Sequence, residues 1–223
     1  EELGLEPPAT WQELIEAGKA IEAESDLEAI SMYYGVNAGQ NLFNWLNHLW
    51  GNGADIFDEK QCPIFNSPEG VEATQAYVDL LLKHELTAPG SVTFNEQDAN
   101  LEMVQGRAAM FVGWSWMYDR FTNKETAAPD VYGNVGFAPA PGWEGGEPLT
   151  YGYIWPVGIL QSSKNQDAAW EYIKWLTNVQ VEREIAIDKS DPMTSNIVVV
   201  HLSNLRDPEV NATTGGLQEV MGE

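Results

Sequence analysis

The chain has 223 residues, of which 34 are Asp or Glu and 11 are Lys or Arg, so its formal net charge is −23. Nucleic acid and anionic lipid carry the same sign of charge, and binding to either is therefore disfavoured. Hydrophobic residues make up 43% of the chain, which is enough to build the core of one large domain or two small ones.

Two settings explain so acidic a composition. In concentrated salt, screening removes the repulsion between carboxylates, and an acidic surface then keeps a folded protein soluble. The alternative is an acidic protein from a low-pH or an ordinary environment. A disordered acidic tail is excluded, because the chain has nine tryptophans to bury. We favour the hypothesis of a halophilic protein.

Several familiar signals are missing. No run of about 18–20 apolar residues is present, so no segment is expected to span a membrane. The sequence begins without a signal-like stretch, and any targeting segment is expected to have been removed or to lie upstream. Cys62 is a single cysteine, which excludes an internal disulfide. The three histidines are scattered and no metal or nucleotide motif is found, so we expect no metal and no cofactor.

The first predicted element is a helix over residues 10–24, where Thr10 and Glu13 form a capping box. Asn95 is expected to cap a later helix that Gly106 closes. The other elements expected before residue 106 are a strand at 29–34, helices at 41–50, 67–84 and 96–105, and a small hairpin or an irregular excursion at 55–65. The acidic residues of that hairpin (Asp55, Asp58 and Glu59) lack the spacing of a calcium loop, so a solvated turn is expected there.

The segment Arg107–Tyr118 is the one around which the chain is organised. Its apolar run, Ala108–Gly113, predicts a short and fully buried strand. Trp114 and Trp116 follow directly, at the strand end where α/β proteins usually bind their ligands. Each indole N–H needs a hydrogen-bond partner, so we expect at least one of the two to face a ligand.

The second half of the chain mixes further helices and strands. The element order gives an α/β fold class. The expected elements are a helical turn at 116–122, a strand at 134–140, a loop at 141–148, an extended stretch at 151–160 with a bend at Pro156, helices at 165–178 and 179–187, a connector at 188–195, an apolar helix at 196–205 and a polar, glycine-rich tail.

Five stretches, taken in order, resemble the extracellular solute-binding proteins of ATP-driven sugar importers, the maltose-binding-like group. They cover nearly the whole chain, and their order and spacing are specific although each is weak alone. The stretches are Pro8–Leu14 (PATWQEL), Phe65–Val71 (FNSPEGV), Gln105–Met110 (QGRAAM) with Trp116-Met117 after it, Pro139–Gly142 (PAPG), and Ser163–Leu176 (SKNQDAAWEYIKWL).

The resemblance implies a periplasmic-binding-protein-like fold of type II, with two lobes, a hinge and a sugar held between the lobes. Residues 1–152 then form the main part of the C-terminal lobe, 153–190 return to the N-terminal lobe, and 191–223 are C-lobe helices. It implies a protein that is not an enzyme, that captures a carbohydrate outside the cell or in the periplasm, and that delivers it to ABC transporter permease subunits. Anchoring by a lipid on a missing upstream segment is compatible with this.

Sugar rings bind on aromatic faces, and sugar hydroxyls bind to amide and carboxylate groups. Trp116 is the best candidate, because in the resembled family the indole after this strand commonly stacks on a sugar, whereas Trp114 could instead pack inward. Trp45 is equally compatible with the core, and polar residues at a helix start often only cap it. The full candidate ligand set is Gln40, Asn41, Asn44, Trp45, Trp114, Trp116, Tyr151, Tyr153 and Trp155.

Two other classes of protein stay open. A glycoside hydrolase needs only two carboxylates about 5–10 Å apart across a sugar, although nothing in the sequence selects a pair. A carbohydrate-binding module without a transport role is the other alternative. Outside the site, we expect Trp170 and Trp175 to be core residues and Asp119 with Arg120 to form an exposed ion pair.

Overall fold

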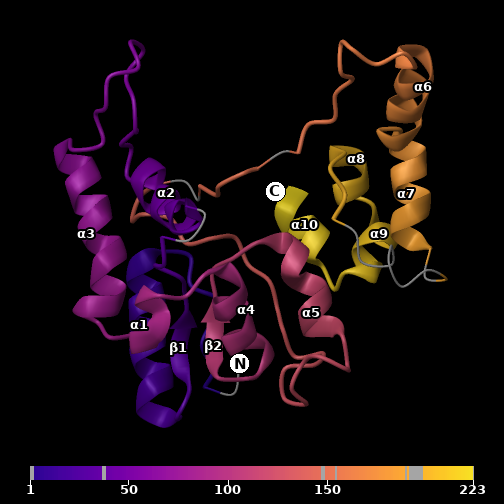
Figure 1. The fold of residues 1–223 in the computed structure, drawn as a ribbon. Helices are drawn as coiled ribbons and strands as arrows, with labels where there is room; N and C mark the ends of the chain where they lie inside the picture. The colour runs from indigo at the N-terminus through magenta and orange to yellow at the C-terminus, as the bar shows by residue number, and fades with distance from the viewer. Residues whose placement is uncertain are drawn as a thin grey trace. The chain divides into compact units, whose positions relative to one another are not determined.

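The structure is a computed structural model that describes residues 3–36, 39–146, 149–153, 155–188, 190 and 198–222. The chain divides into two compact units, Glu1–Tyr151 and Gly152–Glu223, and Figure 1 shows the elements of each. The first unit holds both strands of the sheet that the described residues form, whereas the regular elements of the second are helices.

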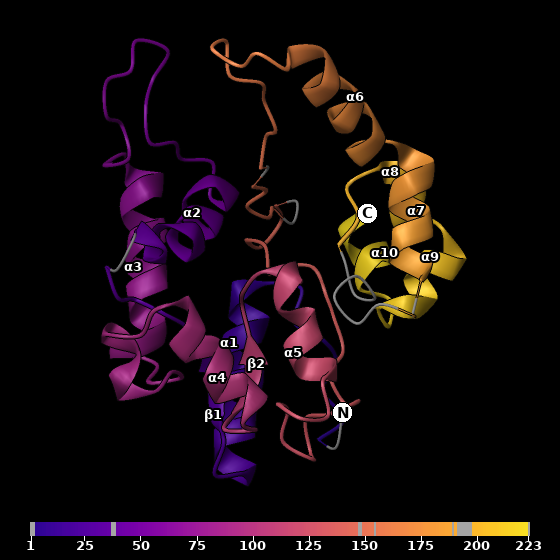
Figure 2. The ribbon, with the colours of Figure 1, turned by 45° about the vertical axis from the view of Figure 1, so that its right-hand side comes forward.

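The first unit is built on a parallel pair of strands, β1 (Glu28–Ser31) and β2 (Ala108–Phe111), in which Ile30 pairs with Met110. Helix α1 (Trp11–Glu24) packs against β1, and α4 lies beside β2 (Figure 2). The other helical elements of this unit are α2 (Asn41–Gly51), α3 (Pro68–Leu82), α4 (Glu96–Val104), α5 (Tyr118–Thr122) and the short 3-10 turns η2 (Pro89–Val92) and η3 (Ser115–Met117).

Local hydrogen bonds begin these helices where the sequence predicts. The Thr10 hydroxyl accepts from Glu13 N at 3.1 Å, and the Glu13 carboxylate accepts from Thr10 N at 3.3 Å, so the capping box is confirmed. Asn95 Oδ1 accepts from Gln97 N at 2.7 Å at the start of α4. Gly106 follows α4 with φ +68°, a left-handed conformation that glycine adopts without strain.

The main core of this unit lies between α1, β1 and α3. Large apolar side chains from these three elements lose almost all their solvent contact, and this burial is the principal favourable term in folding. Apolar residues of α1 recur at helical spacing, which explains why one face of that helix meets the sheet. The buried members of this core are Trp11, Leu14, Ala29, Ile30, Met32, Tyr77, Leu80 and Leu86.

Two strand predictions need correction. β2 ends at Phe111 and only Ala108 of its four residues is buried, so the prediction of a fully buried strand was wrong. The last three residues of its partner β1 are buried, whereas three residues of β2 stay partly exposed, so an apolar run does not by itself decide how far packing covers a strand. Residues 134–140 form no strand, since irregular backbone leads there into Pro139, which cannot donate to a ladder. The described residues of 151–160 form no helix or strand, which is compatible with the extended stretch expected there.

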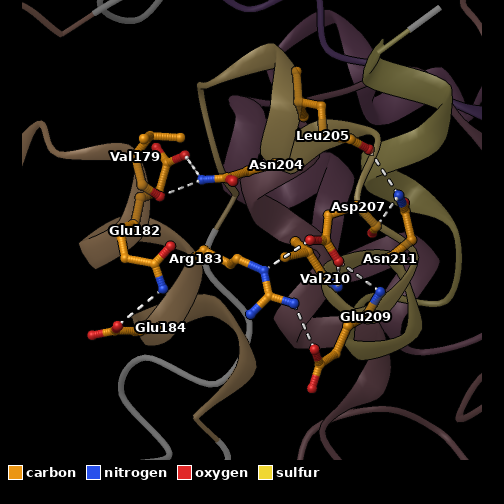
Figure 3. A network of polar contacts seen from close by, with 11 residues as sticks. Val179, Glu182, Arg183, Glu184, Asn204, Leu205, Asp207, Glu209, Val210 and Asn211 are labelled. Atoms are coloured by element: carbon orange, nitrogen blue, oxygen red, sulfur yellow. Dashed lines mark hydrogen bonds and ion pairs between the residues drawn. The ribbon is translucent and has the colours of Figure 1, made fainter.

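The second unit consists of short helices joined by polar contacts. Its helices are α6 (Gln166–Leu176), α7 (Val179–Ile187), α8 (Leu202–Leu205), α9 (Pro208–Thr213) and α10 (Leu217–Gly222). Figure 3 shows the network that links α7 to α8 and α9. Arg183 donates to Asp207 Oδ2 at 2.8 Å and to Glu209 Oε2 at 2.6 Å, and Asn204 Nδ2 donates to Glu182 Oε2 at 2.8 Å.

The end of the chain differs from the sequence prediction. A helix was expected over 196–205, but within the described residues helix occupies only Leu202–Leu205, and residues 196 and 197 lie outside them. The polar, glycine-rich tail contains the helices α9 and α10, in agreement with the helices that the resemblance implies for 191–223. Asp207 explains the start of α9, because its Oδ1 accepts from Glu209 N and Val210 N ahead of Pro208 at the first turn. Most of the expected connector at 188–195 lies outside the described residues.

Helix α6 exposes the aromatic side chains that its pattern was expected to bury. Trp170 is 54% exposed and Trp175 51% exposed, so the prediction that both are core residues is wrong for this chain. None of the residues of α6 is buried. The amphipathic pattern predicts an apolar face correctly, but the burial of that face requires a partner surface that the described residues do not provide.

We expect this face of α6 to make the 223-residue chain self-associate, because contiguous exposed apolar surface favours association. Light scattering should show a mass that rises with protein concentration, and the double substitution Trp170→Ser with Trp175→Ser should restore a monomer. Tyr132→Ser is the matched control, since Tyr132 is an exposed aromatic of the first unit. A wild-type chain that is monomeric at all concentrations would contradict the expectation.

The net charge leads to a second expectation. If carboxylate repulsion is screened in the natural setting, the melting temperature should rise steeply between ~0.1 M NaCl, where the Debye length is ~10 Å, and molar NaCl, where it is ~3 Å. Sucrose at matched osmolality is the control for exclusion effects that do not depend on charge. A melting temperature that stays constant over this range would remove the halophilic hypothesis.

Candidate functional site

The candidate site lies where the two parallel strands end. Parallel strands bring their carboxyl ends to one edge of a sheet, and ligands of α/β proteins bind beyond that edge. Tyr33 and Tyr34 follow β1, and Trp114 and Trp116 follow β2. The sequence analysis selected the two tryptophans because they follow a strand end. The parallel pairing places Tyr33 and Tyr34, which follow β1, at the same edge.

An aromatic cluster forms at this edge around Trp114. Its ring is edge-on to Phe43 of α2, with centroids 5.0 Å apart, and edge-on to Tyr151 at 5.7 Å. Tyr151 also stacks on Trp50 with an angle of 12° between the planes. A hydrogen bond from Tyr151 N to Asn47 Oδ1 at 2.8 Å holds the chain there. Of the predicted residues, Trp114 and Tyr151 are therefore brought together.

A buried carboxylate lies beside this cluster. Glu96, the first residue of α4, is 5% exposed, and its Oε2 accepts from Gln40 Nε2 at 2.8 Å. Burial raises the pKa of Glu96, while a hydrogen bond from the Trp114 side chain and the positive charge of Arg120 act in the opposite direction. Burial and the charge of Glu96 also raise the pKa of the Tyr33 phenol.

Trp116 presents an open indole at the same strand end. It is 45% exposed, and the Arg120 guanidinium lies 5.9 Å from its ring centroid, within the range of a cation–π contact. Arg120 also donates from Nη1 to Asn100 Oδ1 at 3.4 Å. The expected ion pair of Asp119 with Arg120 is thus replaced by contacts of Arg120 with an indole and an amide. The Asn100 side-chain nitrogen has no partner within the described residues.

The polar candidates of α2 have different surroundings. Gln40 precedes the helix without capping it, since its side chain bonds to Glu96 instead. Asn44 is 3% exposed and lies away from solvent, whereas the Asn41 side chain is half-buried. Trp45 donates from Nε1 to Thr74 Oγ1 at 2.9 Å and packs on the core, which is the alternative that its apolar neighbours suggested.

Tyr153 and Trp155 belong to the second unit. They are 53% and 83% exposed, and their rings are perpendicular with centroids 5.5 Å apart. The two units are described separately, so the position of Tyr153 and Trp155 relative to the candidate site stays a prediction.

Residues 55–65 fold back on themselves in a short turn that Asp58 stabilises. Phe57 and Pro63 form an isolated antiparallel bridge, and Asp58 Oδ1 accepts from Lys60 N and Cys62 N at 2.8 Å. Across the described ranges of the chain, no group of three or more His, Cys, Asp or Glu side chains could hold a metal ion. The Asp58 carboxylate, one of the three acidic groups considered as calcium ligands, thus accepts backbone hydrogen bonds that stabilise a turn.

Glu96 and Phe43 are among the candidate-site residues that the sequence did not reveal. Glu96 follows the helix cap Asn95, and an acidic residue in a first helical turn is ordinarily explained by the helix dipole. The one available signal was its place at the start of a helix that leads directly into β2. Phe43 lay inside an apolar helix pattern and gave no distinguishing signal.

The parallel β1–β2 pair with flanking helices, and the ligand edge at its carboxyl end, define an α/β protein of the type II periplasmic-binding-protein-like class, the fold of the solved structures that it resembles. The model of the family described as bacterial extracellular solute-binding protein matches residues 1–182. The chain belongs to this family.

Individual relatives are between 24% and 29% identical to the chain over the aligned residues. It is 29% identical to the maltose-bound T. maritima MalE3, with a TM-score of 0.75 over 97% of this chain and 54% of that one. A solute-binding protein of Agrobacterium radiobacter K84 in complex with ribitol is 25% identical, with a TM-score of 0.73 over 99% and 53% of the two chains. A probable amino-acid ABC transporter periplasmic-binding protein of Sinorhizobium fredii is 24% identical over 93% of this chain and 44% of its own length. The chain thus spans about half the length of its relatives.

Proposed function

We propose that the protein binds a sugar or a sugar alcohol and delivers it to the permease subunits of an ABC importer. The observation that carries this proposal is the exposed indole of Trp116 at the strand end, beside Arg120 and next to the Trp114 cluster. The maltose and ribitol bound to two of the similar structures support this class of ligand.

The chemistry of the candidate site suits a polyhydroxylated ligand. The C–H face of a sugar ring packs on an indole plane, and its hydroxyls need donors and acceptors at the rim. Trp116 offers the plane, Arg120 offers donors, and Gln40 offers an amide that is half-buried beside the aromatic cluster. The wider set of candidates, Asn41, Asn44, Trp45, Tyr151, Tyr153 and Trp155, is proposed on the sequence argument and the resemblance.

We further propose that the protein is not an enzyme. A glycosidase needs an acid with a raised pKa and a second carboxylate facing it across the sugar. Burial raises the pKa of two described carboxylates, Glu96 and Glu28. Glu96 lies at the carboxyl edge of the strand pair and Glu28 begins β1 at the opposite edge, so these two do not face one another. Absence of aryl-glycoside hydrolysis by the purified protein would support a binding role, and turnover would favour the hydrolase.

The location and the lobe assignment are also proposals. Membership in an extracellular family supports action outside the cell or in the periplasm, and anchoring by a lipid is compatible with it. Helices within the described residues are all too short or too polar to cross a membrane. We assign 1–152 to the main part of the C-terminal lobe, 153–190 to a segment returning to the N-terminal lobe, and 191–223 to C-lobe helices.

Isothermal titration of the longest natural form of the protein tests the ligand class. Maltose, maltotriose, mannitol and ribitol form one panel, and a set of amino acids forms the other. We expect saturable binding to at least one member of the first panel and none in the second. Binding to amino acids alone would replace the proposed ligand class, and the absence of binding in both panels would contradict the proposal.

A further inference from the structure

We propose that the Glu96 carboxylate is a positioning residue for the candidate ligand site, holding Gln40 in place by accepting a hydrogen bond from its amide and orienting the neighbouring Trp114 indole. The predicted effect on ligand binding rests on the proposed function. The positioning of Gln40 and Trp114 by Glu96 does not depend on it. It assigns a role to a residue that lies behind the ligand-facing side chains and does not itself need to touch a ligand.

The geometry of Glu96 carries the first step of the argument. Three segments far apart in the sequence meet at its side chain: Gln40 before α2, Glu96 at the start of α4, and Trp114 after β2. Gln40 Nε2 donates to Glu96 Oε2 at 2.8 Å, and Glu96 N donates back to Gln40 Oε1 at 3.4 Å. The Trp114 side chain interacts with the same carboxylate and also with the Tyr33 phenol.

Burial carries the second step. Burying a charged carboxylate costs free energy unless hydrogen-bond donors satisfy its oxygens. Glu96 is only 5% exposed, so water cannot readily replace the donors that the protein supplies. A charge-assisted hydrogen bond is also roughly twice as strong as a neutral one. An ionised Glu96 therefore holds the Gln40 amide, and orients the Trp114 indole that interacts with it, more firmly than a neutral amide in its place.

The third step links the carboxylate to the ligand side of the site. Trp114 is the ring that Phe43 and Tyr151 contact edge-on, so its tilt sets the arrangement of the aromatic cluster. Preorganised side chains bind more tightly because less freedom is lost on binding. Loss of the Glu96 contact should then weaken ligand binding without removing any residue that faces the ligand.

The charged and titratable groups around Glu96 are few. Tyr33 after β1 and Arg120 in α5 interact with it electrostatically from neighbouring elements. On its own helix, Asp98 is engaged in the capping box with Asn95. Since burial raises its pKa, Glu96 should take up a proton at a higher pH than an exposed glutamate does.

The first experiment needs no ligand. The indole N–H resonances of the ¹⁵N-labelled chain are followed from pH 8 to pH 4.5, and the Trp114 signal is assigned by its loss in Trp114→Phe. We expect the Trp114 signal to shift as Glu96 protonates and to lose this titration in Glu96→Gln, while the Trp155 signal serves as the exposed control. A Trp114 signal that titrates identically in Glu96→Gln, or does not titrate in either protein, would overturn the proposal.

The second experiment measures affinity by titration with maltose and ribitol. Glu96→Gln places an amide against the Gln40 amide and should weaken binding about tenfold, which corresponds to one lost hydrogen bond to a charged group. The exchange Gln40→Glu with Glu96→Gln restores a donor facing an acceptor, and we expect it to recover affinity to within about threefold of wild type. Melting temperatures of both variants establish that the measured affinities refer to folded protein.

The outcomes separate the two proposals. If no member of the sugar and sugar-alcohol panel binds the wild-type protein, the proposed function fails, while the Trp114 titration still decides whether Glu96 positions the indole. If Glu96→Gln lowers the melting temperature but leaves the affinity of folded protein unchanged, Glu96 is structural and the positioning role is overturned. An exchange variant that binds no better than Glu96→Gln would also overturn it.

Discussion

Replacing Trp116 with alanine is expected to weaken sugar binding by about ten- to a hundredfold while changing the melting temperature of the free protein little. Stacking of a sugar on an exposed indole is worth about 1–3 kcal/mol, reasoning from apolar area and aromatic contacts. The indole is 45% exposed and contacts the Arg120 guanidinium at its face, so its removal leaves no sealed cavity. Isothermal titration and a thermal melt on the same variant measure both quantities.

Two matched variants make this result specific. Trp116→Phe keeps an aromatic plane and should retain part of the affinity. Trp170→Ala removes an indole of similar exposure from α6 of the other unit and should leave the affinity unchanged. A Trp116→Ala protein that loses about 3–5 kcal/mol of stability but keeps its affinity would identify Trp116 as a core residue and remove it from the site.

Mild acid is expected to destabilise the first unit through His48. Its imidazole is 1% exposed, stacks on Trp11 with ring centroids 3.7 Å apart, and is held by a hydrogen bond of Nδ1 with Asn44 O at 2.9 Å. Burial lowers the pKa of His48 to about 4, although the hydrogen bond to Asn44 acts in the opposite direction. Within the described residues its Nε2 has no partner, so a proton there would be buried without an acceptor.

The direction of the pH dependence follows from linkage. The unfolded chain binds a proton at His48 near pH 6.5 and the folded chain only near pH 4, so the stabilising contribution is complete above pH 6.5 and is lost as the pH falls toward 4. His48 contributes about 3 kcal/mol to the free energy of unfolding over the full pH range, and about 2 kcal/mol of this is lost between pH 7 and pH 5. Urea unfolding at several pH values measures this loss.

His48→Leu tests the assignment to this residue. The variant is expected to be less stable at pH 7, because it loses the stack on Trp11, but its free energy of unfolding should fall less between pH 7 and pH 5 than that of the wild type. His84→Gln is the control, since His84 is partly exposed and should account for little of the slope. Equal slopes for wild type and His48→Leu would contradict the assignment.

The sequence predicted most helix starts and the strand that leads into the site. Thr10 with Glu13, Ser67 ahead of Pro68, and Asn95 each signal a cap whose hydrogen bonds close within two or three residues. Such interactions depend on neighbours in the chain, and they are therefore visible without a tertiary structure. The weak motifs that lie in order along the chain identified the family for a related reason, since they mark the same local turns and helix starts.

The burial of particular aromatic residues required the tertiary structure. Trp114 and Trp116 stand two positions apart in one segment, yet one enters the cluster with Phe43 and Tyr151 and the other stays exposed beside Arg120. Trp170 has an amphipathic helical pattern around it and is nevertheless exposed. Periodicity shows which residues share a face, but whether that face is covered depends on segments distant in the sequence.

The sequence by itself therefore determined the local starts of helices, the family, and the strand end at which a ligand site is expected. The tertiary structure decided that Glu96 lies buried between Gln40 and Trp114, because that contact joins segments 56 residues apart. It also decided that 134–140 is irregular and where the helices of the tail begin and end. Hydrogen bonds between near neighbours can be deduced from residue order, whereas the desolvation of a carboxylate or an indole depends on every element that packs around it.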